Sequence, residues 1–320
     1  MKKTLKGFVR DYGGPPKRHL GQVFLIERSI QEKILSLAEL EPEDTVVEIG
    51  PGPGALTREI LSRVRRLIAI EIDPRLAAYL RASLESSSGL FLICMDALRF
   101  DYRRASSRLG IPLKIVGNLP YSISGPLLFS FMEHCDAFKL LVLMLQKEVA
   151  ERLTSTPGNK EYGSLTVLSR FYLDITVEHH VSRRCFSPVP KVDSTIVRCV
   201  PKKIRGLLEP GQTQTFRRVV KAAFSTRRKT LFNSLRLSLN PALPENQLHE
   251  ILSRCRLNAN RRAETLCLEE FVGLTLCVHE AQKSMDKPTG FSDNAFPENP
   301  VPRSGRGSRR AGRTQGRSAA

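Results

Sequence analysis

The feature that most constrains the fold is an alternation of short, β-rich apolar runs with segments of helical spacing. The run Thr45–Ile49 ends at a glycine and leads into a helical pattern. Similar runs recur along the first half of the chain, at residues 67–72, 90–95, 113–116 and 139–145. Strands that alternate with helices form parallel sheets covered by helices on both faces. The sequence therefore predicts an α/β fold.

The pattern changes after Gln146. Helical spacing at residues 147–153 and 164–171 precedes two β-rich runs at 175–181 and 194–200, which we expect to finish the sheet as an antiparallel hairpin. Residues beyond 212 show helical periodicity only. We expect a basic flexible arm, a sheet domain, a small all-α domain and a disordered Arg-rich tail, at residues 1–18, 19–200, 212–284 and 285–320.

The charge of the chain points to a polyanionic partner. The formal net charge is +18 and the pI is about 10.0. Basic proteins of this kind bind nucleic acid or anionic membranes. No long basic amphipathic helix stands out, and the apolar run Leu140–Leu145 is too short to span a bilayer. We therefore expect nucleic acid, and no membrane, as the partner.

The cysteines and histidines argue against a metal site. The 7 cysteines are scattered, and none has CxxC spacing, which favours reduced thiols in a cytoplasmic protein over a disulfide framework or zinc site. His179 and His180 are adjacent, and adjacent residues on a strand point to opposite faces. No metal is expected.

Three predicted strand ends carry the groups that a nucleoside ligand requires. The first strand leads into Gly50-Pro51-Gly52-Pro53-Gly54, a loop whose glycines permit close approach of a ligand. The second ends at Glu71, placed to pair with ribose hydroxyls, and the third ends at Asp96, placed to accept from an adenine amine. The alternative is a structural turn with two surface acids. Glu48 adds a carboxylate beside the first glycine, which suits a sulfonium ligand better than a pyrophosphate.

The fourth strand leads into Gly117-Asn118-Leu119-Pro120-Tyr121-Ser122. This stretch offers a side-chain amide, a carbonyl before a proline and an aromatic face, the set that a planar base with an exocyclic amine requires. Pro120 stiffens the turn and removes one backbone donor. The alternative is a strand-to-helix turn in which Asn118 caps the following helix.

These motifs resemble two nested families. The GxGxG spacing after Glu48 resembles the class I S-adenosylmethionine-dependent methyltransferases, with a Rossmann-like sheet, and Asn118–Tyr121 resembles the N/D-PP-Y/F motif of amino methyltransferases. From about Lys17 to Leu276 the chain resembles the ribosomal RNA adenine N6,N6-dimethyltransferases. The matching elements are Gly21–Leu25, Glu48–Gly52, Gly117–Ser122, Leu145–Val149, Tyr162-Gly163, Phe186–Pro188 and Pro190–Ser194.

The resemblance implies a reaction and a partner. The Leu145–Val149 and Pro190–Ser194 elements are similar to those of the housekeeping branch, which dimethylates two adjacent adenines in the hairpin loop near the 3′ end of 16S rRNA. The expected protein is a monomer that uses S-adenosylmethionine. The alternatives are a 23S rRNA methyltransferase of the antibiotic-resistance branch, which the Arg/Gly-rich tail favours, and a non-catalytic RNA-binding assembly factor.

The resemblance also implies roles for individual residues. In the expected catalytic set, the Asn118 amide oxygen and the Leu119 carbonyl accept the N6 hydrogens, Pro120 stiffens the turn, and Tyr121 stacks on the base. Phe186 supplies a second aromatic wall, unless it is a core residue beside a Pro-rich turn. The expected cofactor contacts are Val23, Leu25, Gly50, Gly52, Glu71, Asp96 and Asn118. Val23 departs from the family, which usually has Asn or His there, so only its backbone groups remain for that contact.

A cluster of basic residues lies in the predicted helical domain. Its members are Arg217, Arg218, Lys221, Arg227, Arg228 and Lys229. In a neutral chain they would be a solvated helix face, but in this strongly basic chain we expect them to bind the RNA backbone.

Overall fold

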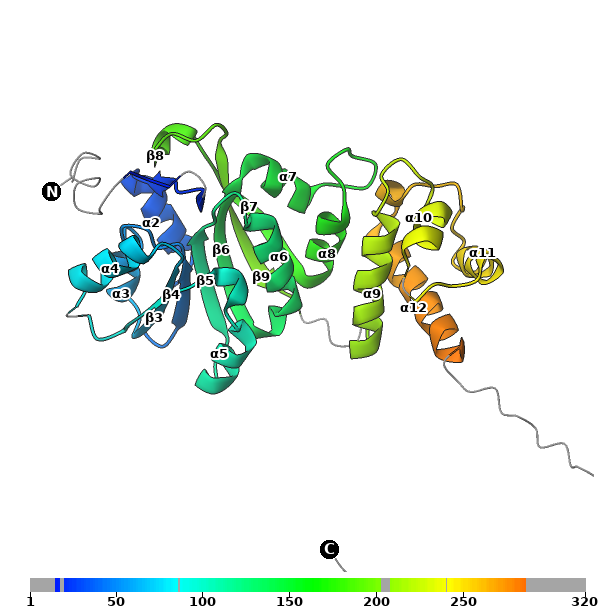
Figure 1. Cartoon of the computed structure of the whole chain (residues 1–320), viewed down its shortest axis with the longest axis horizontal. Helices are drawn as coiled ribbons and strands as arrows, with labels where there is room; N and C mark the ends of the chain where they lie inside the picture. Colours follow the sequence, from blue (N-terminus) through cyan, green and yellow to red (C-terminus); the bar gives the residue numbers. More distant parts are fainter. Residues whose placement is uncertain (1–14, 18–19, 86, 203–207, 240, 286–320) are drawn as a thin grey trace, which may run out of the picture.

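The computed structural model describes residues 15–17, 20–85, 87–202, 208–239 and 241–285. Within these residues the central sheet has seven strands in the order β4-β3-β2-β5-β6-β9-β7 (Figure 1). The strands are β2 Thr45–Ile49, β3 Arg66–Glu71, β4 Leu90–Cys94, β5 Leu113–Asn118, β6 Phe138–Gln146, β7 Leu173–Val181 and β9 Ser194–Pro201. Most of the expected N-terminal arm and nearly all of the expected Arg-rich tail lie outside the described residues.

The strand directions confirm the predicted sheet. Strands β2 to β6 pair in parallel, whereas β9 is antiparallel to both β6 and β7 and lies between them. Opposite Ile49, the last residue of β2, lies Gly117 near the end of β5, and opposite Glu71 lies Cys94. The carboxyl ends of the parallel strands therefore meet at one edge, where the predicted ligand groups follow them.

Helices cover both faces of the sheet, as expected for an α/β fold. Neighbouring side chains of β2 point to opposite faces: Val46 packs in the same core as α2 and α3, and Val47 packs in the core that includes α6, α7 and α8. The helices up to the last strand are α2 Arg28–Leu37, α3 Thr57–Leu61, α4 Pro74–Ser83, α5 Tyr102–Leu109, α6 Ser124–Glu133, α7 Lys147–Thr154 and α8 Ser164–Tyr172.

A second, two-stranded sheet joins segments far apart in the sequence. Strand β1, Phe24–Leu25, pairs antiparallel with β8, Phe186–Ser187. Figure 1 shows β1 in dark blue beside the green segment that carries β8. This pairing fixes the segment of residues 20–25 next to the carboxyl edge of the main sheet.

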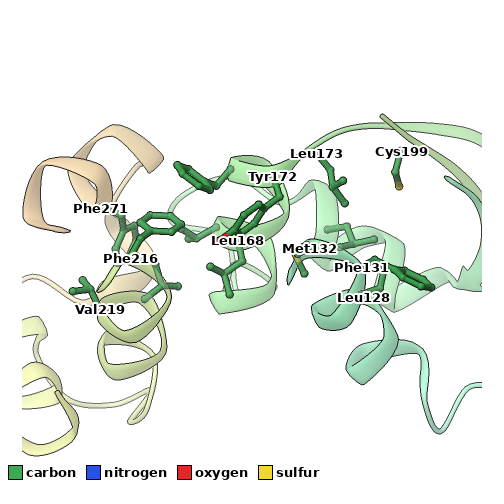
Figure 2. Close-up of a cluster of buried hydrophobic side chains, with 14 of the residues drawn as sticks. Leu128, Phe131, Met132, Leu168, Tyr172, Leu173, Cys199, Phe216, Val219 and Phe271 are labelled. Atoms are coloured by element: carbon green, nitrogen blue, oxygen red, sulfur yellow. The ribbon is translucent and has the colours of Figure 1, made fainter. Parts of the chain in front are cut away.

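The carboxyl-terminal part is all-α, as predicted. Its helices are α9 Pro210–Ala223, α10 Leu231–Ser238, α11 Glu245–Arg254 and α12 Leu268–Met285. One buried cluster runs from the sheet through α6 and α8 into α9 and α12 (Figure 2). The rings of Phe171 on α8 and Phe216 on α9 lie 4.3 Å apart between centroids. Among the described residues, no helix is both long and apolar enough to cross a membrane.

Candidate active site

A pocket at the carboxyl edge of the sheet brings together nearly all the predicted catalytic and cofactor-binding residues. Its walls come from the segment of residues 20–25, the glycine loop after β2, the ends of β3 and β4, and the turn after β5. The predicted residues that line it are Val23, Leu25, Gly50, Gly52, Glu71, Asp96, Asn118, Leu119, Pro120 and Tyr121. Residues about a hundred positions apart in the chain therefore form one site.

The glycine loop has a backbone that other residues would not adopt. Gly52 has a φ of +55°, and a Cβ there would lie 3.0 Å from the Phe24 ring. Gly54 has a φ of +85°, and its Cβ would meet Leu80 at 2.6 Å. Left-handed φ values strain any residue with a Cβ. The loop consequently presents bare backbone to the pocket, as the sequence predicted.

Glu71 is buried and tied to that loop. Its carboxylate accepts hydrogen bonds from the backbone N–H groups of Gly52, at 3.1 Å, and Asp73, at 2.9 Å. Burial raises the pKa of Glu71 above its ordinary value. Each carboxylate oxygen retains a further lone pair, so the group can still accept hydroxyl donors of a ribose.

Glu48 is a pocket residue with an unusual environment. Its side chain is only 2% exposed, and within the described residues its Oε2 has no hydrogen-bond partner. Burial, with the nearby charge of Glu71 as a further cause, raises the pKa of Glu48 to about 8. Burial thus keeps the Glu48 carboxyl largely neutral at pH 7, and a cation placed beside it would favour its ionised form.

Asp96 and Asp73 have different roles at neighbouring strand ends. The Asp96 carboxylate accepts from the Leu98 N–H at 2.9 Å and lines the pocket. Asp73 is fully buried and accepts from Arg75, Gln22 and Lys17, at 2.8, 2.8 and 3.3 Å. Hydrogen bonds from Arg75, above all, hold the pKa of Asp73 well below its usual range. The carboxylate therefore anchors the pocket wall around Gln22 to the start of α4, a role that strand-end position alone did not reveal.

The Asn118 amide is held by the backbone of the opposite wall. Its Nδ2 donates to the carbonyl oxygen of Val23 at 2.9 Å. Because a carbonyl can only accept, this contact fixes which end of the amide faces Val23 and leaves Oδ1 as the acceptor on the other side. The helix that follows is capped at Ile123 with no side-chain hydrogen bond, so Asn118 is not its cap. Val23 therefore contributes to this contact with its backbone carbonyl and not with its side chain.

The rest of the turn presents one carbonyl and one ring. The Leu119 N–H donates to the Met144 carbonyl at 3.1 Å, and its side chain is buried. Within the described part of the chain, no donor is paired with the Leu119 carbonyl. The Tyr121 hydroxyl lies 3.3 Å from Ser194 Oγ on β9, which anchors the half-buried ring at the pocket wall.

Phe186 is the predicted site residue that the structure does not bring to the pocket. Its side chain is 1% exposed and packs in a core cluster with Leu25, Val181 and Ile196. The cause is the β1–β8 pairing, which sets Phe186 opposite Leu25 and turns its ring inward. In this arrangement Phe186 cannot stack on a base, and it matches the alternative of a core phenylalanine.

The six basic residues do not share one helix face. Arg217 donates to the Tyr172 hydroxyl at 2.6 Å and lies over that ring, and Arg218 donates to Gln282 at 3.1 Å. Lys221 is exposed on α9. The other three, Arg227, Arg228 and Lys229, are exposed in the loop between α9 and α10, where Arg227 donates to the Lys160 carbonyl. Two of the six residues therefore help to pack α9, and the other four are exposed.

Comparison with known proteins finds relatives and solved structures that match most of the chain. The ribosomal RNA small subunit methyltransferase A of Geobacter metallireducens is 41% identical over 268 residues, covering 83% of this chain and 97% of that protein. A dimethyladenosine transferase from Plasmodium falciparum superposes with a TM-score of 0.68 at 28% identity, covering 81% of this chain and 98% of that one. The 23S rRNA methyltransferase ErmE superposes with a TM-score of 0.60 at 28% identity, covering 79% and 98%.

The family assignment rests on the whole of this match. The family model described as ribosomal RNA adenine dimethylase matches residues 16–273, a range that includes every wall of the pocket and the first three C-terminal helices. The chain belongs to the ribosomal RNA adenine dimethylase family.

Proposed function

We propose that the protein transfers methyl groups from S-adenosylmethionine to N6 of two adjacent adenines in the 3′-terminal hairpin loop of 16S rRNA. The observation that carries the proposal is the Asn118 amide, which Val23 holds with Oδ1 left as an acceptor. Relatives about 40% identical over more than four-fifths of this chain bear the name of small-subunit methyltransferases. The enzyme acts as a monomer, with residues 19–200 as the catalytic part and 212–284 as the part that grips the RNA.

The pocket suits S-adenosylmethionine. When bound, this cofactor supplies a methyl group on a positively charged sulfonium. Glu71 would accept from the ribose hydroxyls and Asp96 from the adenine amine, and the bare backbone at Gly52 allows close approach. The buried, unpartnered Oε2 of Glu48 fits a cationic ligand in the same pocket.

The turn after β5 would orient the target amine. An adenine N6 is a weak nucleophile because its lone pair is delocalised into the ring. The Asn118 Oδ1 and the Leu119 carbonyl each accept one N6 hydrogen, which turns the lone pair out of conjugation, and Tyr121 holds the base flat. The proton is lost readily after methyl transfer, so no side-chain base is required. Catalysis is then mostly positioning and electrostatics.

The test is Asn118→Ala. We expect it to lower kcat by about a hundredfold or more, the usual loss when one preorganised polar contact to the transition state is removed. Binding of S-adenosylmethionine, measured by calorimetry, should change much less than kcat, because the glycine loop, Glu71 and Asp96 remain to hold the cofactor. Asn159→Ala, which changes an asparagine outside the pocket, is the control. A variant of Asn118 that methylates undermethylated small subunits at the full rate would refute the mechanism.

The likeness to ErmE supports a second candidate, methylation of 23S rRNA. Primer extension on both rRNAs after methyl transfer separates the two candidates: we expect modified adenines in the small-subunit rRNA only. Cross-linking of labelled S-adenosylmethionine to the purified chain tests the third alternative, a non-catalytic RNA-binding factor, which would give no adduct.

A further inference from the structure

Exposed apolar side chains gather beside the candidate active site. Val189 is 61% exposed, Val192 is 40% exposed and Ile26 is 58% exposed. Single exposed apolar residues are common on protein surfaces and do not by themselves indicate a binding site. These three, however, lie on two segments joined by a hydrogen bond from the Ile26 N–H to the Cys185 carbonyl, at 2.9 Å. We call residues 182–193 the lip loop.

The lip loop is fastened at both ends. At its end, the Asp193 carboxylate accepts from the Arg183 N–H at 2.9 Å, and the Asp193 carbonyl accepts from the Lys147 N–H at 3.0 Å. The Arg183 guanidinium also donates to the Lys191 carbonyl, at 3.3 Å. In addition, Phe186–Ser187 within the loop pairs with Phe24–Leu25, a segment that lines the pocket. The exposed valines are therefore presented by a braced loop.

The loop is also connected to the ring that holds the base. Ser194 directly follows Asp193, and its hydroxyl lies 3.3 Å from the Tyr121 hydroxyl. This contact joins the end of the lip loop to Tyr121, and the β1–β8 pairing joins the loop to the pocket wall at Phe24–Leu25.

The charges on the lip loop match RNA. Arg184 and Lys191 are exposed, and within the described part of the chain neither has an acidic partner. The loop's one acid, Asp193, is used in the internal hydrogen bond to Arg183. Apolar side chains flanked by cations complement single-stranded RNA, because the side chains can contact the faces of the bases and the cations can contact the phosphates. An anionic membrane also combines these chemistries, but continuity with a pocket for one base favours RNA.

We propose that Val189 and Val192 are a wedge that occupies the place of the target adenine in the RNA stack, while Arg184 and Lys191 hold the flanking phosphates. The proposal rests on the proposed function, because a base must leave its stack to reach the pocket. Apolar side chains that insert between bases are a known means of holding nucleic acid open. The valines are thus positioning residues, which act on the RNA rather than on the reacting atoms.

The experiment uses the full chain and small subunits whose 16S rRNA carries 2-aminopurine at one target position. This base brightens when it unstacks from its RNA neighbours and lacks the N6 amine, so the labelled position reports flipping and cannot itself be methylated. The variant is Val189→Ser/Val192→Ser. The control is Val177→Ser, because Val177 is also 40% exposed but lies on β7, outside the lip loop.

We expect the double variant to lose most of the fluorescence rise on the labelled subunits. On subunits with both natural adenines it should lose about tenfold in kcat, a loss comparable to that of one stacking contact. Its calorimetric affinity for S-adenosylmethionine should be unchanged, which excludes misfolding. Replacing the neighbouring rRNA base with an abasic residue, which weakens the stack, should restore activity to the double variant. Val177→Ser should match the unmodified chain.

The experiment distinguishes failure of the proposed function from failure of the wedge. If the unmodified chain neither methylates small subunits nor brightens 2-aminopurine, the proposed function fails. If it does both and the double variant does so equally well, only the wedge is refuted. The wedge is also refuted if the unmodified chain binds phosphatidylglycerol vesicles, the double variant does not, and the fluorescence rise is the same for both, because the lip loop then faces a membrane.

Discussion

At the scale of single residues, the pocket depends on backbone groups as much as on side chains. Val23 has no polar side chain, yet its backbone carbonyl fixes the Asn118 amide. That contact does not depend on the side chain, so valine at this position leaves it intact. The reverse applies to Phe186, whose type suits a stacking role but whose strand pairing places the ring in the core.

Glu48 gives a residue-scale prediction about pH. In the folded protein its pKa is raised to about 8, against an ordinary value of 4.5. The folded state therefore binds more protons than the unfolded state between these values, and the free energy of unfolding falls as pH rises from 4.5 to about 8. Glu48→Gln, which removes the titration, should be more stable than the parent by a few kcal/mol at pH 8 and nearly equal near pH 5.

The measurement for Glu48 is thermal unfolding without cofactor at several pH values between 5 and 8. The parent curve should slope downward across that window, and the glutamine variant should lose much of the slope. Parallel curves for the two proteins would show that the Glu48 carboxyl titrates near its ordinary value and that the pocket does not hold it neutral.

At the scale of elements, Asp73 joins one helix to the pocket wall. It caps α4 by accepting from the Arg75 N–H at 3.1 Å, and it anchors Gln22 and Lys17. Gly21 in turn approaches the turn after β5, where a Cβ would lie 3.7 Å from Pro120. Asp73→Ala should weaken S-adenosylmethionine binding by about tenfold, because the wall loses charge-assisted hydrogen bonds.

Asp101→Ala is the matched control for Asp73→Ala. Asp101 caps α5 in the same way, accepting from the Arg104 N–H at 2.9 Å, but it lies outside the pocket. Asp101→Ala should lose about 1 kcal/mol of stability, as is typical for loss of a helix cap, and Asp73→Ala should lose more, because the buried Asp73 carboxylate also accepts from Gln22 and Lys17. Calorimetry should show the affinity loss in the Asp73 variant alone; equal affinities in both variants would contradict an anchoring role for Asp73.

The elements also show what sequence can and cannot predict. The strands β2 to β6 are apolar runs closed by glycine, acid or amide, so their existence and the carboxyl edge were predictable. Helix α5 was missed because its one buried residue is Tyr102, which leaves no apolar periodicity. Strands β1 and β8 were missed because two residues carry no pattern. For the same reason the Asn118–Val23 contact and the position of Phe186 required three-dimensional information.

At the scale of the whole molecule, some basic residues of the C-terminal part help to pack its helices and others are exposed on the surface. Arg217 and Arg218 help to pack α9, through Tyr172 and Gln282, inside a core that continues from the sheet into the C-terminal helices. The loop after α9 lies instead beside the loop between α7 and α8, as the contact of Arg227 with the Lys160 carbonyl shows. Its exposed cations therefore lie near the loop that follows α7, and α7 begins at the carboxyl end of β6.

Arg228 and Lys229 are therefore expected to contact rRNA phosphates. Arg228→Gln/Lys229→Gln should weaken binding to small subunits, and the slope of log K against log salt should decrease in magnitude by about 1.5, since each phosphate contact contributes about 0.7 to 0.9. Filter binding at several salt concentrations measures both. Arg63→Gln/Arg65→Gln removes the same charge from exposed residues at the amino end of β3, the edge opposite the pocket, and should leave the slope unchanged. Equal decreases for the two variants would mean that the net charge of the chain, and not the loop between α9 and α10, governs binding.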